Sequence, residues 1–223
     1  MIKVRRKQKQ KLFSVVATTF FVMISLFVYI SLSKQFTTIP DQPAGPKLSQ
    51  RVIDYQPIVG EELRKYGKEA YTGIVLSLMM QESAGRGMDP MQASESYCGE
   101  VGCIDDPALS IQQGAKYFSY VLDKAGGDVK LALQSYNFGE GFITYVQEHG
   151  GNYTKQLAID FSAMMYDRLR DTGNYSCLRD EAVPHDACYG DILYVDAVLG
   201  YYATASNLDD NGSWVVSLTN EEE

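Results

Sequence analysis

The sequence predicts a mainly helical, single-domain fold, and three observations support this class. From about Leu48 onward, apolar residues recur at intervals of three and four residues, which is the period of an amphipathic helix. No segment shows the sustained alternation of apolar and polar residues that is typical of strands. Start and stop signals divide the helical pattern, among them Asp-Asp-Pro at 105–107 and Gly-Gly at 126–127.

The first helical segment, 48–66, contains Pro57, which predicts a kink because proline removes one backbone hydrogen bond. The acidic residues before Pro107 and the acid Asp128 are predicted to cap the two helices that follow them. In chain order we expect helices over 48–66, 70–83, 107 to the glycine pair, 128 to about 139, 153–170 and about 191–204.

The chain begins with a basic segment followed by an apolar one. Residues 1–11 carry six positive charges and no acid, and residues 13–32 carry no charge over the length that crosses a bilayer as a helix. This predicts a cytoplasmic tail at 1–11 and a transmembrane signal-anchor at 12–33, with the rest of the chain outside the cell. A cleaved signal peptide followed by secretion stays open, because Ser31 and Ser33 form a weak cleavage site.

The segment after the anchor is rich in proline and predicts a linker or stalk at 34–47. The folded domain is expected over 48–206, and the acidic tail 207–223 is expected to be disordered. Removing the six positive charges of the basic tail from the net charge of −8 leaves −14 for the external part. This acidity argues against nucleic acid as a partner.

Four cysteines fit an oxidising compartment. The pairing Cys98–Cys103 with Cys177–Cys188 is favoured because each bond closes a short loop that contains glycine or proline. The alternative is a zinc site built from Cys177, His185 and Cys188, but this spacing matches no standard zinc template. We therefore expect disulfides, no metal and no cofactor.

Glu82 is a candidate catalytic acid because of its position on a helix. It follows Val75, Leu78 and Met79 by seven, four and three residues, so it shares their apolar stripe. Partial desolvation raises the pKa of a carboxyl group, and the helix C-terminus acts in the same direction. A carboxylic acid that stays protonated near neutral pH is what cleavage of a glycosidic bond requires. Spacing alone nevertheless favours the alternative, a glutamate at a helix end turned to solvent.

Four ordered motifs give this position more weight. They are Met-Gln-Glu-Ser at 80–83, Asp-Pro-Met-Gln-Ala-Ser-Glu-Ser at 89–96, Ala-Leu-Gln-Ser-Tyr-Asn-Phe-Gly at 132–139 and Tyr-Gly-Asp-Ile-Leu-Tyr-Val at 189–195. Together they resemble the lysozyme-like superfamily of goose-type lysozymes and lytic transglycosylases. The sequence is most similar to a Gram-positive branch, found in the cell-wall hydrolases of conjugative elements and in pneumococcal vaccine antigen A-like proteins.

The resemblance implies a single goose-type helical domain, preceded by the transmembrane helix, that acts on peptidoglycan. Glu82 is then the catalytic acid. The side chains that the resemblance assigns to sugar binding are Ser83, Gln92, Ser94, Tyr136, Asn137 and Tyr194. Each has a structural alternative: a serine can end a helix, amides can brace loops, and most of the sixteen tyrosines are structural. One departure from the third motif is Ser135, where the family commonly has alanine.

Asp89 decides between two reactions. As a second catalytic carboxylate it would position or activate water and make the chain a muramidase, which cleaves between N-acetylmuramic acid and N-acetylglucosamine. As a turn former before Pro90 it would leave Glu82 alone, as in lytic transglycosylases that form 1,6-anhydro-muramic ends. We favour hydrolysis and keep transglycosylation as the alternative.

Partners follow from the same resemblance. Glycan strands of peptidoglycan are the expected substrate, the membrane is contacted through the N-terminal helix, and a conjugation or secretion apparatus is a further candidate. A non-catalytic glycan-binding role in such an assembly is the main rival to an enzyme. A chitin-type hydrolase shares the chemistry but suits a membrane-tethered bacterial protein less well.

Overall fold

A computed structural model of the chain describes residues 46–205, and the side chains up to Tyr202. Every regular element in this range is helical, which confirms the predicted fold class. The predicted cytoplasmic tail, the signal-anchor, almost all of the linker and the acidic tail lie outside the described residues. Within 46–205, no helix combines the length and the apolar character that a membrane crossing needs.

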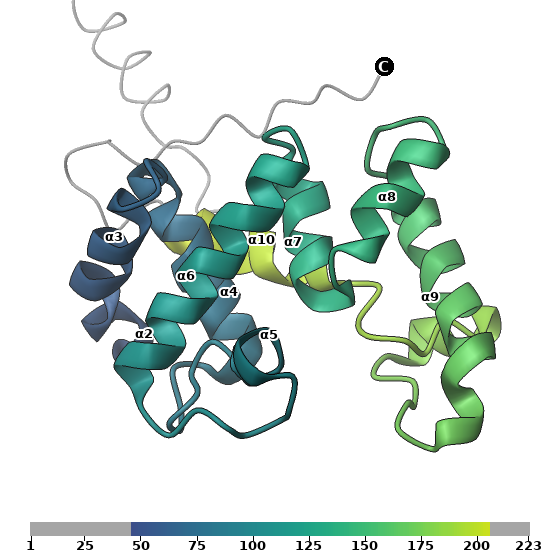
Figure 1. Ribbon diagram of the computed structural model, residues 1–223, viewed down its shortest axis with the longest axis horizontal. Coiled ribbons are helices and arrows are strands. Elements are labelled where there is room, and N and C mark those ends of the chain that lie inside the picture. Colours follow the sequence, from purple (N-terminus) through teal and green to yellow (C-terminus); the bar gives the residue numbers. More distant parts are fainter. Residues whose placement is uncertain (1–45, 206–223) are drawn as a thin grey trace, which may run out of the picture. The chain divides into compact units, whose positions relative to one another are not determined.

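The helices of the described range are shown in Figure 1. In chain order they are α2 (Gln50–Asp54), α3 (Gln56–Arg64), η1 (Glu69–Tyr71), α4 (Thr72–Ser83), α5 (Ser94–Cys98), α6 (Pro107–Lys124), α7 (Val129–Phe138), α8 (Gly141–Glu148), α9 (Lys155–Leu169), η2 (Arg170–Thr172), η3 (Asp180–His185) and α10 (Tyr194–Ala205).

The two predicted acidic caps are present. The side chain of Asp106 accepts a hydrogen bond from the N–H of Ala108 at 3.0 Å, and Pro107 occupies the first turn of α6. The side chain of Asp128 accepts from the N–H of Leu131 at 2.9 Å and starts α7. These contacts satisfy backbone donors that have no partner inside a helix, so both helices begin where the sequence predicted.

One predicted helix is divided in the structure, and two short helices were not predicted. The segment 48–66 forms two helices, α2 and α3, which separate at Tyr55, and Pro57 lies in the first turn of α3, where its missing N–H costs nothing. The short helices α5 and α8 were not predicted. The α8 sequence is rich in aromatic and β-branched residues, and its helix is stabilised by burying Phe142, Ile143 and Val146.

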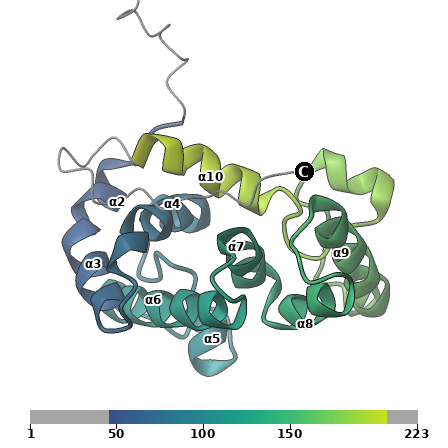
Figure 2. The ribbon, with the colours of Figure 1, turned by 90° about the horizontal axis from the view of Figure 1, so that it is seen from above.

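Helix α4 lies at the centre of the domain. All six residues from Ile74 to Met79 are at most 1% exposed, so the helix is buried on every side and not along one stripe. Helix α10 packs against both α4 and α7 and runs across them in the view of Figure 2. The C-terminal end of the buried α4 therefore meets the N-terminal end of α10.

Helices α8 and α9 pack against each other beside α7 (Figure 2). Aromatic rings fill the space between them, with ring centroids of Phe142 and Phe161 5.2 Å apart and those of Phe138 and Phe161 5.6 Å apart. Two disulfides fix loops at the surface, Cys98–Cys103 after α5 and Cys177–Cys188 around η3. This is the pairing expected from the loop lengths.

Candidate active site

Glu82 is the penultimate residue of α4 and is half-buried. Its Oε1 accepts a hydrogen bond of 2.5 Å from the hydroxyl of Tyr194, the first residue of α10. Tyr194 is only 2% exposed, and burial together with the neighbouring Glu82 raises the pKa of its hydroxyl well above the ordinary value. The tyrosine therefore stays protonated and holds the carboxyl group in one orientation.

The environment of Glu82 favours its neutral form. Burial is the main cause that raises the pKa of Glu82, and the charges of Asp89 and Asp191 raise it too. The hydrogen bond from Tyr194 lowers it in part, and the resulting pKa is about 7. The sequence prediction of a desolvated acid at this helix end is thereby confirmed. Near neutral pH a large share of the molecules carries a proton on Glu82, which a general acid must donate.

Asp89 lies in the loop after α4, and its carboxylate accepts four hydrogen bonds. Its Oδ1 accepts from the N–H of Ala93 at 2.8 Å and from the hydroxyl of Ser110 at 2.6 Å. Its Oδ2 accepts from the N–H and the hydroxyl of Ser94 at 3.0 and 2.6 Å. The carboxylate thus ties α5 and α6 to the loop that follows Glu82.

The hydrogen bonds to the carboxylate of Asp89 determine its protonation state. Its partial burial raises the pKa, but the hydrogen bonds from Ser110, from Ser94 and from two backbone N–H groups lower it more, and the resulting pKa is below the ordinary value. Asp89 is therefore an anion at neutral pH. A carboxylate offers about four lone-pair directions, and all four have a donor here.

The loop between α4 and α5 has an unusual backbone. Gln92 adopts a left-handed conformation, with φ of 49°, and is exposed, while its Nε2 donates to the carbonyl of Asp89 at 2.8 Å. Such a conformation costs energy in a non-glycine residue and is frequent at functional sites. The amide oxygen of Gln92 has no hydrogen-bond partner among the described residues and is free to accept from a ligand.

Both serines of this region make internal hydrogen bonds. The hydroxyl of Ser83 donates to the carbonyl of Pro90 at 2.7 Å and accepts from the N–H of Arg86 at 3.1 Å. Ser94, which is 4% exposed, bonds to Asp89 and accepts from the N–H of Ile104 at 3.2 Å. Their observed contacts brace the loop.

Helix α7 supplies the opposite side of the site. The hydroxyl of Tyr136 donates to the carbonyl of Met91 at 2.9 Å, and the Oδ1 of Asn137 accepts from the N–H of Asp191 at 2.8 Å. The amide nitrogen of Asn137 has no partner within residues 46–205. A Cβ on Gly190, which has a φ of 64°, would lie 2.6 Å from Asn137 Oδ1, so glycine is needed there.

Three residues that support this site were not predicted from the sequence: Ser110, Arg179 and Asp191. Ser110 holds Asp89 from α6 and gave no local signal, since its partner is 21 residues away. Asp191 is 4% exposed and paired with Arg179 at 2.7 Å, and its charge acts on Glu82. Asp191 did lie inside the quoted motif 189–195, and its place next to a glycine in that motif was the available signal.

No metal centre is apparent in the described part of the chain, where no three His, Cys, Asp or Glu side chains are grouped to hold an ion. The zinc alternative was wrong, because Cys177 and Cys188 are joined as a disulfide and are not available as thiolate ligands.

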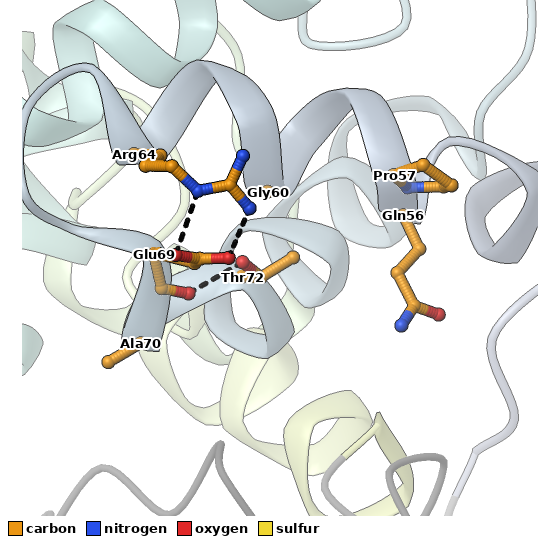
Figure 3. A pocket seen from close by; sticks show the side chains of 7 residues that line it. All are labelled: Gln56, Pro57, Gly60, Arg64, Glu69, Ala70 and Thr72. Atoms are coloured by element: carbon orange, nitrogen blue, oxygen red, sulfur yellow. Dashed lines mark hydrogen bonds and ion pairs between the residues drawn. The ribbon is translucent and has the colours of Figure 1, made fainter.

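A cavity of about 510 Å³ lies between α3 and η1, away from these residues. Figure 3 shows that the guanidinium of Arg64 in its wall is held by the carboxylate of Glu69, with an Nε to Oε2 distance of 3.0 Å. The Thr72 hydroxyl donates to the carbonyl of Glu69 at 2.6 Å. The charged groups of this cavity satisfy each other, and none of them was predicted as functional.

Comparison with known proteins gives relatives over most of the chain. The membrane protein YocA of Bacillus subtilis (strain 168) is 37% identical over 187 residues, which are 80% of this chain and 81% of YocA. The bifunctional muramidase/DL-endopeptidase CwlT of the same strain is 36% identical over 82% of this chain. The aligned part is 53% of CwlT, so the chain spans about half the length of that relative.

Two further proteins are similar to this chain over about seven tenths of its length. Pneumococcal vaccine antigen A of Streptococcus pneumoniae is 32% identical over 72% of this chain and 79% of its own length. A Staphylococcus aureus protein described as similar to a lipoprotein of the NLP/P60 family has a solved structure that superimposes with a TM-score of 0.60 and 34% identity, covering 71% of this chain and 54% of that one. Residues 49–202 match the family described as Lysozyme-like, and the chain therefore belongs to that family.

Proposed function

We propose that the chain is a peptidoglycan glycosidase that cleaves the β-1,4 bond between N-acetylmuramic acid and N-acetylglucosamine, with Glu82 as its acid. The observation that carries the proposal is the half-buried carboxyl group of Glu82, which Tyr194 orients and whose pKa is raised to about 7, mainly by burial and also by the charge of Asp89. Membership of the Lysozyme-like family supports a cell-wall glycan as the substrate.

In the first step, protonated Glu82 gives its proton to the glycosidic oxygen while the bond from that oxygen to the anomeric carbon breaks. Positive charge develops on the sugar ring, and the fixed negative charge of Asp89 stabilises it. The resulting Glu82 carboxylate then takes a proton from water as the water oxygen attacks the anomeric carbon. Gln92 and Asn137 are the proposed sugar contacts, since the amide oxygen of Gln92 and the amide nitrogen of Asn137 have no partner among the described residues.

Hydrolysis is supported by CwlT, whose name includes muramidase activity. One observation is equally compatible with the alternative reaction, transglycosylation to a 1,6-anhydro product. All four lone-pair directions of Asp89 already have donors, so this carboxylate has no free site to accept a proton from water. Glu82 then acts as the only base, and it can deprotonate either water or the 6-hydroxyl of the muramic acid.

We further propose that the chain acts outside the cell from an N-terminal anchor at 12–33. The uncharged apolar run and the basic residues before it support this, as does the relative named as a membrane protein.

The test is digestion of purified peptidoglycan by the full-length chain, followed by mass spectrometry of the fragments. We expect fragments with reducing ends, and Glu82→Gln should lower their release at least about 100-fold with an unchanged melting temperature. Glu61→Gln, an exposed glutamate on α3, is the matched control and should keep full activity.

Anhydro ends in place of reducing ends would establish transglycosylation. Absence of any fragment from the unmodified chain would contradict the enzyme proposal and favour glycan binding without turnover. Full activity of Glu82→Gln would show that another group is the acid.

A further inference from the structure

A second cavity of about 440 Å³ lies between α8 and α9. Aromatic rings and thioethers line most of it, and one cation and one anion also lie in its wall. These residues are Phe138, Tyr145, Phe161, Met164, Met165 and Tyr189, together with Glu148 and Arg168. The Phe161 ring centroid is 5.3 Å from that of Tyr145 and 6.2 Å from that of Tyr189, so the apolar wall is already packed without a ligand.

The two charged residues of the cavity have no partners. Arg168 is exposed and forms no ion pair or hydrogen bond within residues 46–205, and the same is true of Glu148. Other arginines nearby do have carboxylate partners: Arg170 pairs with Asp167 at 3.0 Å, and Arg179 pairs with Asp191. An unpaired guanidinium beside an apolar wall is suited to a carboxylate that arrives with a ligand.

The cavity adjoins the proposed active site through Tyr189. The hydroxyl of Tyr189 donates to the carbonyl of Phe138 at 3.1 Å, and Phe138 directly follows Asn137 in the sequence. Tyr189 itself is followed by Gly190 and Asp191. Burial raises the pKa of Tyr189, and the nearby Tyr175 and the charge of Glu95 on α5 raise it as well. Because Phe138 in the cavity wall directly follows Asn137, a ligand that contacts Asn137 can extend into this cavity.

We propose that the cavity binds the peptide branch of peptidoglycan while the glycan strand lies at Glu82. This rests on the proposed function. Muramic acid carries a short peptide with methyl side chains and free charged groups. The methyl groups fit the aromatic and thioether wall, and a carboxylate of the peptide pairs with Arg168. A bare glycan strand carries only the lactyl carboxylate of its muramic acid, which stays at the sugar ring, and it has no side chains for the apolar wall.

The peptide branch extends well beyond the sugar that carries it. An extended residue spans roughly 3.3–3.6 Å, so a branch of three to five residues reaches roughly 10–18 Å from its sugar. The cavity would thus make peptide-bearing strands the preferred substrate, by a contact that is separate from the reacting bond.

The experiment measures binding without turnover, in the full-length Glu82→Gln variant. Two probes are compared by calorimetry: a glycan oligomer that carries its peptides, and the same oligomer after an amidase has removed them. We expect the peptide-bearing probe to bind more tightly, and Arg168→Gln to weaken its binding about tenfold while leaving the bare glycan unaffected. Arg168→Lys should restore part of the loss, because it keeps the charge without the planar fork.

Arg170→Gln is the matched control, since this arginine is two residues away and does not line the cavity. Equal affinity for both probes, or an equal loss for both in Arg168→Gln, would overturn the proposal. Digestion by the unmodified chain is scored separately. Cleavage of both substrates at equal rates would contradict the peptide-binding role of the cavity but not the proposed reaction. Tighter binding of the peptide-bearing probe without any cleavage would contradict the proposed reaction but not the role of the cavity.

Discussion

Glu82 is an acid whose protonation two neighbours set in opposite directions. The hydrogen bond from Tyr194 lowers its pKa, because it stabilises the carboxylate, and the charge of Asp89 raises it, because it repels the carboxylate. In the proposed mechanism activity requires the protonated form, so we expect the rate to fall as pH rises through the pKa of Glu82, about 7. The pH at which the rate falls on the alkaline side is therefore expected to depend on both Tyr194 and Asp89.

We predict that Tyr194→Phe moves the alkaline limb of kcat/KM to higher pH and that Asp89→Asn moves it to lower pH. The first change removes an interaction that lowers the pKa of Glu82, and the second removes a charge that raises it. Asp89→Asn should also lower the free energy of unfolding by about 2 kcal/mol, since charge-assisted hydrogen bonds are lost. The measurement is kcat/KM against pH on a soluble glycan. Limbs that move in the same direction would contradict this picture.

Single residues were predictable to the extent that their cause is local. The raised pKa of Glu82 was predicted from its spacing after Val75 and Met79 together with the four ordered motifs, since spacing alone favoured a glutamate turned to solvent. The four donors of Asp89 did not follow, since Ser110 reaches it only through the packing of α6. The sequence left Asp89 open between a base and a turn former, and the contacts show a residue that organises the loop.

At the scale of elements, the loop that holds Asp89 depends on how closely α6 approaches it. The N–H of Met91 donates to Ser110 at 3.0 Å, and a Cβ on Gly114 would lie only 2.7 Å from the side chain of Met91, including its Cβ. Glycine is unfavourable inside a helix, so its presence at position 114 is explained by the close approach of Met91.

Gly114→Ala is predicted to push the Met91 loop away from α6. We expect overpacking to destabilise the fold by about 1–3 kcal/mol, partly offset by the better helix propensity of alanine, and glycan cleavage to fall as the loop moves. Gly60→Ala in α3 is the control, because its Cβ would meet Thr72 at an ordinary 3.5 Å. Thermal melting and cleavage rate are measured on both variants. If both variants melt and cleave alike, the close approach has no such role.

Elements with strong local signals were predicted well, and those without them were not. Helices α6 and α7 begin at the predicted caps, Asp106 and Asp128. Helix α5 has only five residues, and α8 lies between glycines with little helix propensity of its own. Both are held by tertiary packing, which a single sequence does not display.

At the scale of the whole molecule, the site forms because α10, late in the sequence, packs against the central helix α4. Tyr194 and Glu82 are 112 residues apart, and they meet because α10 packs against α4. Four motifs in order predicted which segments belong together, but not the contacts between them. The segment that leads into α10 is fixed by the Cys177–Cys188 disulfide and by the pair of Arg179 with Asp191.

Removing that disulfide should therefore loosen the entry to α10. The bond closes a loop with a sequence separation of 11, and the loss of that constraint on the unfolded chain predicts a fall of about 3 kcal/mol in the free energy of unfolding for Cys177→Ser with Cys188→Ser. The shorter Cys98–Cys103 loop, with a separation of 5, predicts about 2 kcal/mol for the equivalent double variant. Denaturant unfolding of both variants, with and without reductant, measures this. An unfolding midpoint equal to that of the oxidised parent would mean that the Arg179–Asp191 pair and the packing of α10 hold the segment without the bond.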